Sequence, residues 1–189
     1  MLRQGWVLRA LLFLMMVLSS ALPASVHATP IGFLQTPVPE GAAGQTVAVT
    51  RVVSGILSYA RWPTEPAPLR LCVAGTPRFA GGLSTLPARS PRRMEVLRIT
   101  GTSAASEGCK ALYLGRLEAD ERRRLIASAR GQAVVTIDED DPPCRAGAMF
   151  CLHVAANSVA FELNLDAVSR STVRIDPKVL LLSRRGERT

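Results

Sequence analysis

Four cysteines carry the clearest chemistry in this sequence, because thiols can form disulfides, bind zinc or act as nucleophiles. They are Cys72, Cys109, Cys144 and Cys151. The N-terminal segment predicts export, and an even number of cysteines in an exported chain predicts two disulfides. Three pairings are open. A local bridge between Cys144 and Cys151 is the simplest choice, and it leaves Cys72 with Cys109. Oxidised thiols are not nucleophiles, and the spacings lack the C-x-x-C pairs of zinc sites.

Few other groups could support catalysis. The two histidines are His27, within the export signal, and His153, in an apolar segment where we interpret it as structural. The sequence has no G-x-S-x-G elbow, phosphate-binding loop or H-E-x-x-H motif. The acidic run 138–141 could bind a hard cation, but it lacks the alternating pattern of a calcium loop, so a solvated strand end is favoured. We therefore expect neither enzyme activity nor a bound metal or cofactor.

The chain is basic, with 23 Lys+Arg against 15 Asp+Glu and a formal charge of +8. Its arginine clusters at 92–93 and 122–124 have no aromatic residues interleaved with them. Nucleic-acid binding commonly needs such stacking platforms, so we expect no nucleic-acid partner.

The N-terminal segment predicts export. Arg3 and Arg9 precede an apolar run over 11–22, and Val26-His27-Ala28 suits a signal peptidase. Residues 1–28 are thus predicted to be a signal peptide cleaved after Ala28. The apolar run is shorter than the roughly 20 residues needed to span a bilayer, so the exported protein is not expected to span the membrane.

In the full sequence, 48% of the residues are hydrophobic and 20% are charged. This composition predicts that the chain after the signal peptide forms one folded domain. Residues 29–45 are predicted to be an extended N-terminal arm. Apolar residues at helical spacing predict an amphipathic helix over 45–61. Further helices are expected over 117–129 and from Pro177 to Leu182, with a short one within 76–87. Strands are expected over 69–74, 94–99, 111–114, 133–137, 150–154 and 159–163.

This alternation predicts an α/β fold. The expected domain is single, with a mostly parallel sheet flanked by helices and an antiparallel pair near the C-terminus. It spans residues 46–183, and residues 184–189 form a charged tail.

Several segments in this order resemble the YfiR family of periplasmic proteins. They are residues 57–63 (LSYARWP), 69–75 (LRLCVAG), 109–114 (CKALYL), 159–167 (VAFELNLDA) and 173–180 (VRIDPKVL). The resemblance covers roughly residues 46–183. It implies an α/β domain that can form a homodimer, with disulfides between Cys72 and Cys109 and between Cys144 and Cys151. It also implies a repressor that binds the periplasmic domain of an inner-membrane diguanylate cyclase, lowers cyclic di-GMP and disfavours biofilm.

Position in the family motif implies that Phe150, Glu162 and Val168 bind the partner. An aromatic and an aliphatic anchor beside one carboxylate suit a protein interface. The alternative is that Phe150 and Val168 belong to the core. Glu162 is the more specific candidate, because it is the only charge in an otherwise apolar strand.

The resemblance also brings Arg61, Trp62 and Arg174 together as a candidate site for a small aromatic or anionic ligand. The alternative is that Trp62 caps the core and both arginines are solvated or paired with acids. Asp176-Pro177 stands where some family members place a histidine, which counts against the anion site. Two other functions stay open: a periplasmic small-ligand-binding module serving another membrane receptor, and a secreted enzyme with paired carboxylates. The disulfides offer the repressor a redox input.

Overall fold

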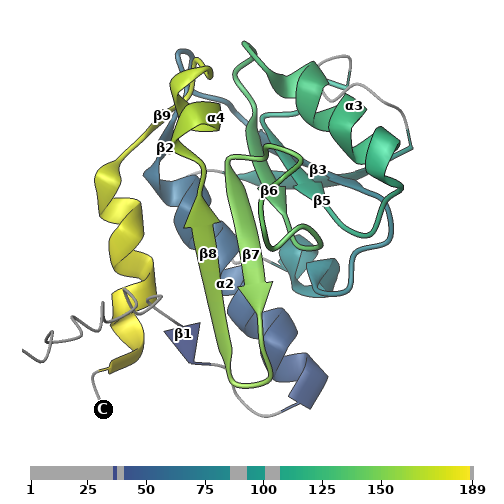
Figure 1. Ribbon diagram of the computed structural model, residues 1–189. Coiled ribbons are helices and arrows are strands. Elements are labelled where there is room, and N and C mark those ends of the chain that lie inside the picture. Colours follow the sequence, from purple (N-terminus) through teal and green to yellow (C-terminus); the bar gives the residue numbers. More distant parts are fainter. Residues whose placement is uncertain (1–35, 38–40, 86–92, 101–106, 188–189) are drawn as a thin grey trace, which may run out of the picture. The chain divides into compact units, whose positions relative to one another are not determined.

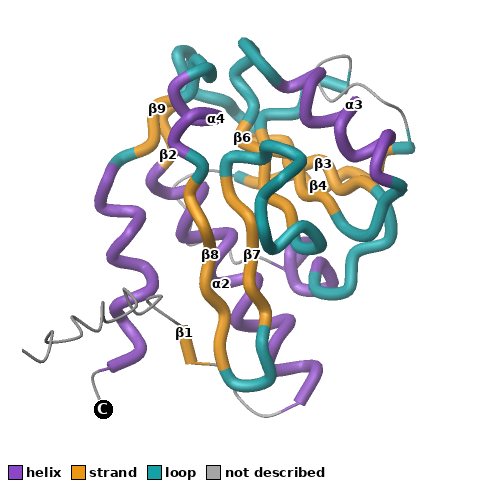
Figure 2. Tube along the Cα trace, in the orientation of Figure 1, coloured by secondary structure: helices purple, strands orange, loops and turns teal. Residues whose placement is uncertain are grey.

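The computed structural model describes residues 36–37, 41–85, 93–100 and 107–187 (Figures 1 and 2). The predicted signal peptide and most of the predicted arm lie outside these residues. The elements are β1 (Thr36–Pro37), α2 (Gly41–Tyr59), β2 (Ala60–Arg61), β3 (Leu69–Ala74), η1 (Ala80–Thr85), β4 (Met94–Ile99), β5 (Ala111–Leu114), α3 (Ala119–Ala129), β6 (Val135–Asp138), β7 (Phe150–Val154), β8 (Ser158–Leu163), α4 (Leu165–Ser169), β9 (Arg174–Ile175) and η2 (Pro177–Glu187).

The main sheet has seven strands in the order β1-β8-β7-β6-β5-β3-β4. Four neighbouring pairs are parallel: β3 with β4, β3 with β5, β5 with β6, and β6 with β7. Strand β8 pairs antiparallel with β7 and with β1. The predicted α/β fold with a mostly parallel sheet and an antiparallel pair near the C-terminus is therefore confirmed.

Two helices cover opposite faces of this sheet. Helix α2 buries Val49, Val52, Val53 and Ile56, an i, i+3, i+4, i+7 stripe that packs with β5, β6 and β7 residues. Helix α3 has the same spacing in its buried positions, at 122, 125, 126 and 129, and packs in a separate cluster with Leu112 and Leu114. Figure 1 shows α2 behind β7 and β8. Among the residues described, no helix combines the length and apolar character needed to cross a membrane.

The structure differs from the sequence predictions at several element boundaries. Helix α2 begins at Gly41, so the last residues of the predicted arm belong to it. The C-terminal helix begins at Pro177 as predicted, but η2 is a 3-10 helix. Helix α4 and the two-stranded ribbon of β2 and β9 were not predicted. Both are too short to show hydrophobic periodicity, although Asn164 before Leu165 is a recognisable N-cap.

The crevice between β3 and β5 is filled by the chain itself. Connections from these two strands leave to opposite faces, through η1 and α3, and ligands of open α/β sheets bind at such a switch point. Here Thr76 and Arg116 exchange backbone hydrogen bonds of 3.0 and 3.1 Å across it. A Cβ atom added to Gly75 would lie 2.4 Å from the Arg116 carbonyl oxygen, and one added to Gly115 would lie 2.4 Å from the Pro77 nitrogen. Two glycines therefore allow the loops to close this crevice.

Candidate functional site

Both predicted disulfides are present. Cys72 pairs with Cys109 at a Cα–Cα distance of 5.7 Å, and Cys144 pairs with Cys151 at 5.5 Å. All four cysteines are buried in the cluster on the α3 face of the sheet. The pairing that the resemblance implies is confirmed.

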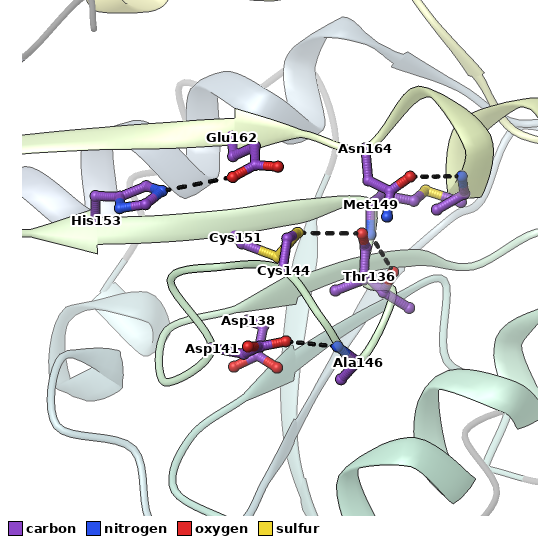
Figure 3. The surroundings of a disulfide bond; sticks show 12 residues. Thr136, Asp138, Asp141, Cys144, Ala146, Met149, Cys151, His153, Glu162 and Asn164 are labelled. Carbon is purple, nitrogen blue, oxygen red and sulfur yellow. Dashed lines mark hydrogen bonds and ion pairs between the residues drawn. A yellow bond between two sulfur atoms is a disulfide. The ribbon is translucent and has the colours of Figure 1, made fainter.

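The Cys144–Cys151 bridge closes a loop with a fixed backbone (Figure 3). The Cys144 N–H donates to the Asp141 carbonyl at 2.8 Å, and the Asp141 carboxylate accepts from the Ala146 N–H at 2.7 Å. At the far end of the loop, the Met149 N–H donates to the Thr136 hydroxyl at 2.8 Å. The loop is thereby attached to β6 as well as to β7.

Met149 also links this loop to helix α4. Its carbonyl accepts from the Asn164 N–H at 2.9 Å. The Asn164 side chain then accepts from the Ala167 N–H at 3.0 Å and caps α4 (Figure 3). A continuous set of hydrogen bonds thus joins the disulfide loop to the helix that carries Val168.

Glu162 lies on the same side of the β7–β8 hairpin as this disulfide. It is directly opposite Cys151 in the antiparallel register, and residues so paired point to the same face. Its carboxylate is 4.0 Å from His153 Nε2, and the two side chains are 46% and 36% exposed. Glu162 is therefore partly exposed to solvent. Figure 3 shows its side chain near the disulfide and directed toward His153.

Phe150 and Val168 do not form one exposed patch with Glu162. Phe150 is fully buried in the α2-side core and packs edge-on against Phe161, with ring centroids 5.6 Å apart. Val168 is half-buried and packs against the same cluster. In this conformation Phe150 offers no surface to a partner. Of the three predicted residues, Glu162 is the most accessible.

The structure places Arg61 directly opposite Arg174 in the β2–β9 ribbon. Both side chains are exposed, and Arg61 Nη1 donates to the Ser58 carbonyl at 2.7 Å. Arg61 Nη1 also donates to the Ala60 carbonyl at 3.0 Å, so this guanidinium is already bonded to the end of α2 and the start of β2. Trp62 does not offer a stacking surface, since it is only 6% exposed and its Nε1 donates to the Lys110 carbonyl at 3.1 Å.

The acidic run 138–141 is a buried network, and the predicted solvated strand end is wrong. Asp138 is fully buried and bonds Arg122 Nη1 at 3.2 Å, and Asp140 bonds Arg122 Nη2 at 3.0 Å. Glu139 accepts from the Tyr113 hydroxyl at 2.6 Å and from the backbone N–H groups of Arg78 and Phe79. Among the described residues, no group of three or more His, Cys, Asp or Glu side chains could hold a metal ion.

Burial raises the pKa of two groups in this network, Asp138 and Tyr113. It raises the pKa of the Asp138 carboxyl to about 6, although a backbone N–H and the Arg122 guanidinium act to lower it. Burial, together with the adjacent Glu139 carboxylate, also raises the pKa of Tyr113 well above its ordinary range, so its hydroxyl stays a donor. Nothing in the sequence marks these contacts, because the partners come from four different elements.

Comparison with solved structures finds distant similarity to parts of larger enzymes, including a lyase and a sulfhydrylase. A methionine gamma lyase from Micromonospora echinospora is 14% identical with a TM-score of 0.39, over 80% of this chain and 47% of the lyase. An O-acetylhomoserine sulfhydrylase from Wolinella succinogenes is 12% identical with a TM-score of 0.43, over 77% of this chain and 53% of the enzyme. The chain spans about half the length of these proteins, and similarity this weak says nothing about its activity.

Comparison with protein families is more informative. The sequence model of the YfiR/HmsC-like family matches residues 47–184, which include β2 to β9 and most of α2. The match also includes both disulfides and every residue predicted to bind a partner or ligand. The family is regulatory and not catalytic. The chain therefore belongs to the YfiR/HmsC-like family, whose members are periplasmic regulators of cyclic di-GMP signalling.

Proposed function

We propose that the protein represses an inner-membrane diguanylate cyclase by binding the periplasmic domain of that enzyme. The family match over residues 47–184 is the observation that carries this proposal. Repression requires that the protein bind the inactive state of the cyclase more tightly than the active state. Export through the predicted signal peptide would place it in the periplasm, in contact with that domain.

Glu162 supplies the charged part of the proposed contact surface. It is exposed, and it sits on a hairpin held by the Cys144–Cys151 loop. A carboxylate in such a position can pair with a basic group on the partner and set the orientation of binding. Val168, half-buried on α4, would add an apolar contact at the edge of this surface, and Phe150 would support the hairpin from its buried side.

The test is cellular cyclic di-GMP in the source bacterium after deletion of the gene, with complementation by the parent or by variants. We expect deletion to raise cyclic di-GMP and the parent gene to restore it. Glu162→Lys should fail to restore it and should bind the purified cyclase domain at least about tenfold more weakly, with an unchanged melting temperature.

Glu118→Lys is the matched control for this reversal. Glu118 is an exposed glutamate whose side chain makes no capping hydrogen bond, and it lies outside the hairpin. It should restore repression like the parent. A Glu162→Lys protein that fails to fold would make this residue structural, and unchanged cyclic di-GMP after deletion would contradict repression altogether.

The disulfides are proposed to tune this repression in response to redox conditions. The Cys144–Cys151 loop is bonded through Met149 to Asn164 and so to α4. Opening the bridge would release that end of the contact surface. A Cys144→Ser, Cys151→Ser variant that repressed as well as the parent under every redox condition would eliminate this bridge as a sensor.

The opposed arginines favour a second candidate function, a small-ligand-binding module that serves another membrane receptor. Arg61 and Arg174 lie opposite each other and are exposed, so an anion between them would relieve their repulsion. Benzoate is a suitable probe because it is both aromatic and anionic. It should raise the melting temperature of the parent and not that of Arg174→Ala. An equal shift in both proteins would exclude this site.

A further inference from the structure

A cavity of about 250 Å³ lies between the first turns of α3 and the loop closed by the Cys144–Cys151 disulfide. Arginines from both sides line it: Arg122 and Arg123 from the helix, and Arg145 from the loop. Asp141 is the one carboxylate among its lining residues. The cavity shares no residue with the Glu162 surface or with the Arg61–Arg174 pair.

The three aspartates on the β6 side of this cavity, Asp138, Asp140 and Asp141, are already engaged within the protein. The Asp141 carboxylate accepts from the Ala146 N–H at 2.7 Å and so holds its own loop. Asp138 and Asp140 both bond Arg122, which is only 7% exposed. Arg122 therefore lines the cavity in a fixed position, and Asp138 and Asp140 neutralise its charge.

Arg145 and Arg123 are available to a ligand. Arg145 is exposed, and across the described ranges it takes part in no hydrogen bond or ion pair. Its backbone position is fixed by the disulfide at the preceding residue and by the Cys144 N–H bond to Asp141. Arg123 pairs with Asp120, but both side chains are more than half exposed, so water screens this pair and an incoming anion can replace it.

We propose that this cavity binds a small oxyanion, a phosphate or a carboxylate, between the guanidinium groups of Arg145 and Arg123. Guanidinium groups match the oxygens of both anions with paired hydrogen bonds. The volume lies below the roughly 300–1,000 Å³ of pockets for drug-sized molecules, which favours a small ion. Ala119, the first residue of α3, also lines the cavity, and the Glu118 side chain does not cap this helix. The first turn of α3 also carries Asp120 and Glu121, which offset its helix dipole, so the proposed attraction depends on the arginines.

The experiment is isothermal titration calorimetry of the disulfide-bonded protein with sodium phosphate and, separately, with sodium malonate, at constant ionic strength in chloride. We expect saturable one-to-one binding of at least one anion. Arg145→Ala should weaken it about tenfold or more, as expected for the loss of a charge-assisted hydrogen bond. Arg123→Ala should weaken it less, because Arg123 must first leave its pair with Asp120 to meet the anion. Binding of phosphate alone, malonate alone or both identifies the class of oxyanion that the cavity accepts.

Two further variants separate this cavity from general attraction to a basic protein and from the other candidate anion site. Arg51→Ala removes an exposed arginine on α2 and should bind like the parent. Arg174→Ala removes the other candidate anion site, so one-to-one binding that persists in this variant and is weakened by Arg145→Ala belongs to the cavity. Melting curves should show that all variants fold. The proposal is overturned if neither anion binds, if Arg145→Ala binds like the parent, or if Arg51→Ala loses as much affinity as Arg145→Ala. These outcomes do not depend on the cyclase, so they are independent of the proposed repression.

Discussion

Buried charges in the acidic run tie together segments that are distant in the sequence. Glu139 holds the loop after β3 through the N–H groups of Arg78 and Phe79, and it accepts the hydroxyl of Tyr113 from β5. Asp138 and Asp140 hold Arg122 against the sheet. A buried carboxylate is tolerated only when hydrogen bonds and charges compensate for its lost hydration. These residues therefore fix the position of the strand ends relative to α3 and to the loop after β3.

Asp138 makes stability depend on pH. Its pKa is raised from 3.8 to about 6, so between these pH values the folded state binds more protons than the unfolded state. Its contribution to the free energy of unfolding therefore falls as pH rises from about 4, and the loss is complete above about pH 6. We expect the parent to lose up to about 3 kcal/mol relative to Asp138→Asn over this range.

Urea unfolding of both proteins from pH 4 to 7 measures this difference. Asparagine has nearly the same shape and does not titrate, so subtraction isolates the residue from the other acids. If the parent instead gains stability over the variant with rising pH, the ion pair with Arg122 outweighs burial.

At the scale of elements, the crevice between β3 and β5, where a ligand could bind in this type of sheet, is closed. The loops after β3 and β5 close the switch point of the sheet, where other α/β proteins bind ligands. The exposed candidate binding residues lie elsewhere: Glu162 on the β7–β8 hairpin, and Arg61 and Arg174 on the β2–β9 ribbon. This arrangement suits a protein that acts through its surface.

Gly75→Ala tests whether the two loops must touch. Gly75 has φ +72°, and an added Cβ would meet the Arg116 carbonyl oxygen at 2.4 Å. We expect a loss of more than about 2 kcal/mol, from left-handed backbone strain plus displacement of the Arg116 loop. Denaturant unfolding provides the measurement.

Gly131→Ala is the matched control for this variant. Gly131 has a similar φ of +69°, but no atom lies within 4 Å of an added Cβ. It should lose only about 1 kcal/mol, which is the cost of the backbone conformation. Equal losses in the two variants would show that the contact between the loops is dispensable.

At the scale of the whole molecule, the described residues from Thr36 onward form one compact unit, and two unequal cores can be counted among them. The α2-side cluster has 22 buried residues, none of them cysteine. The α3-side cluster has 13, of which four are the disulfide cysteines. The smaller core thus depends on covalent cross-links where apolar burial is limited.

Removing either bridge should destabilise the α3-side core more than the α2-side core, because both bridges lie in the α3-side core. The two bridges should also differ in their contribution to stability. The chain-entropy relation gives about 4 kcal/mol for Cys72–Cys109, which encloses the longer loop, and about 2.5 kcal/mol for Cys144–Cys151. Serine variants of each pair, unfolded in urea, should show this order. Hydrogen exchange should accelerate in α3 before α2 in both variants. Faster exchange in α2 first would show that the disulfides support the sheet as a whole.

Much of this protein was predictable from local patterns in its sequence. Helical spacing predicted α2 from Val49, Val52, Val53 and Ile56, and short apolar runs predicted β3, β4, β5 and β7 with the bounds observed. Helix α2 is readable because its buried positions recur every three to four residues. Strands β3 and β5 are readable as continuous apolar runs, because neighbours and helices bury almost every residue of a central parallel strand. The cysteines were partly readable: their even number predicted two disulfides and the short spacing favoured Cys144 with Cys151, while the family resemblance implied the full pairing that the structure shows.

Only the tertiary structure decided how charged and aromatic side chains are used. Glu139 meets Arg78 across 61 residues of sequence, and Arg61 meets Arg174 through two strands too short to leave a pattern. Phe150 and Glu162 both suited an interface by type, yet the strand register buries one and exposes the other. Whether a polar group is solvated, paired or buried depends on partners that the fold brings from distant segments, so no local pattern encodes it.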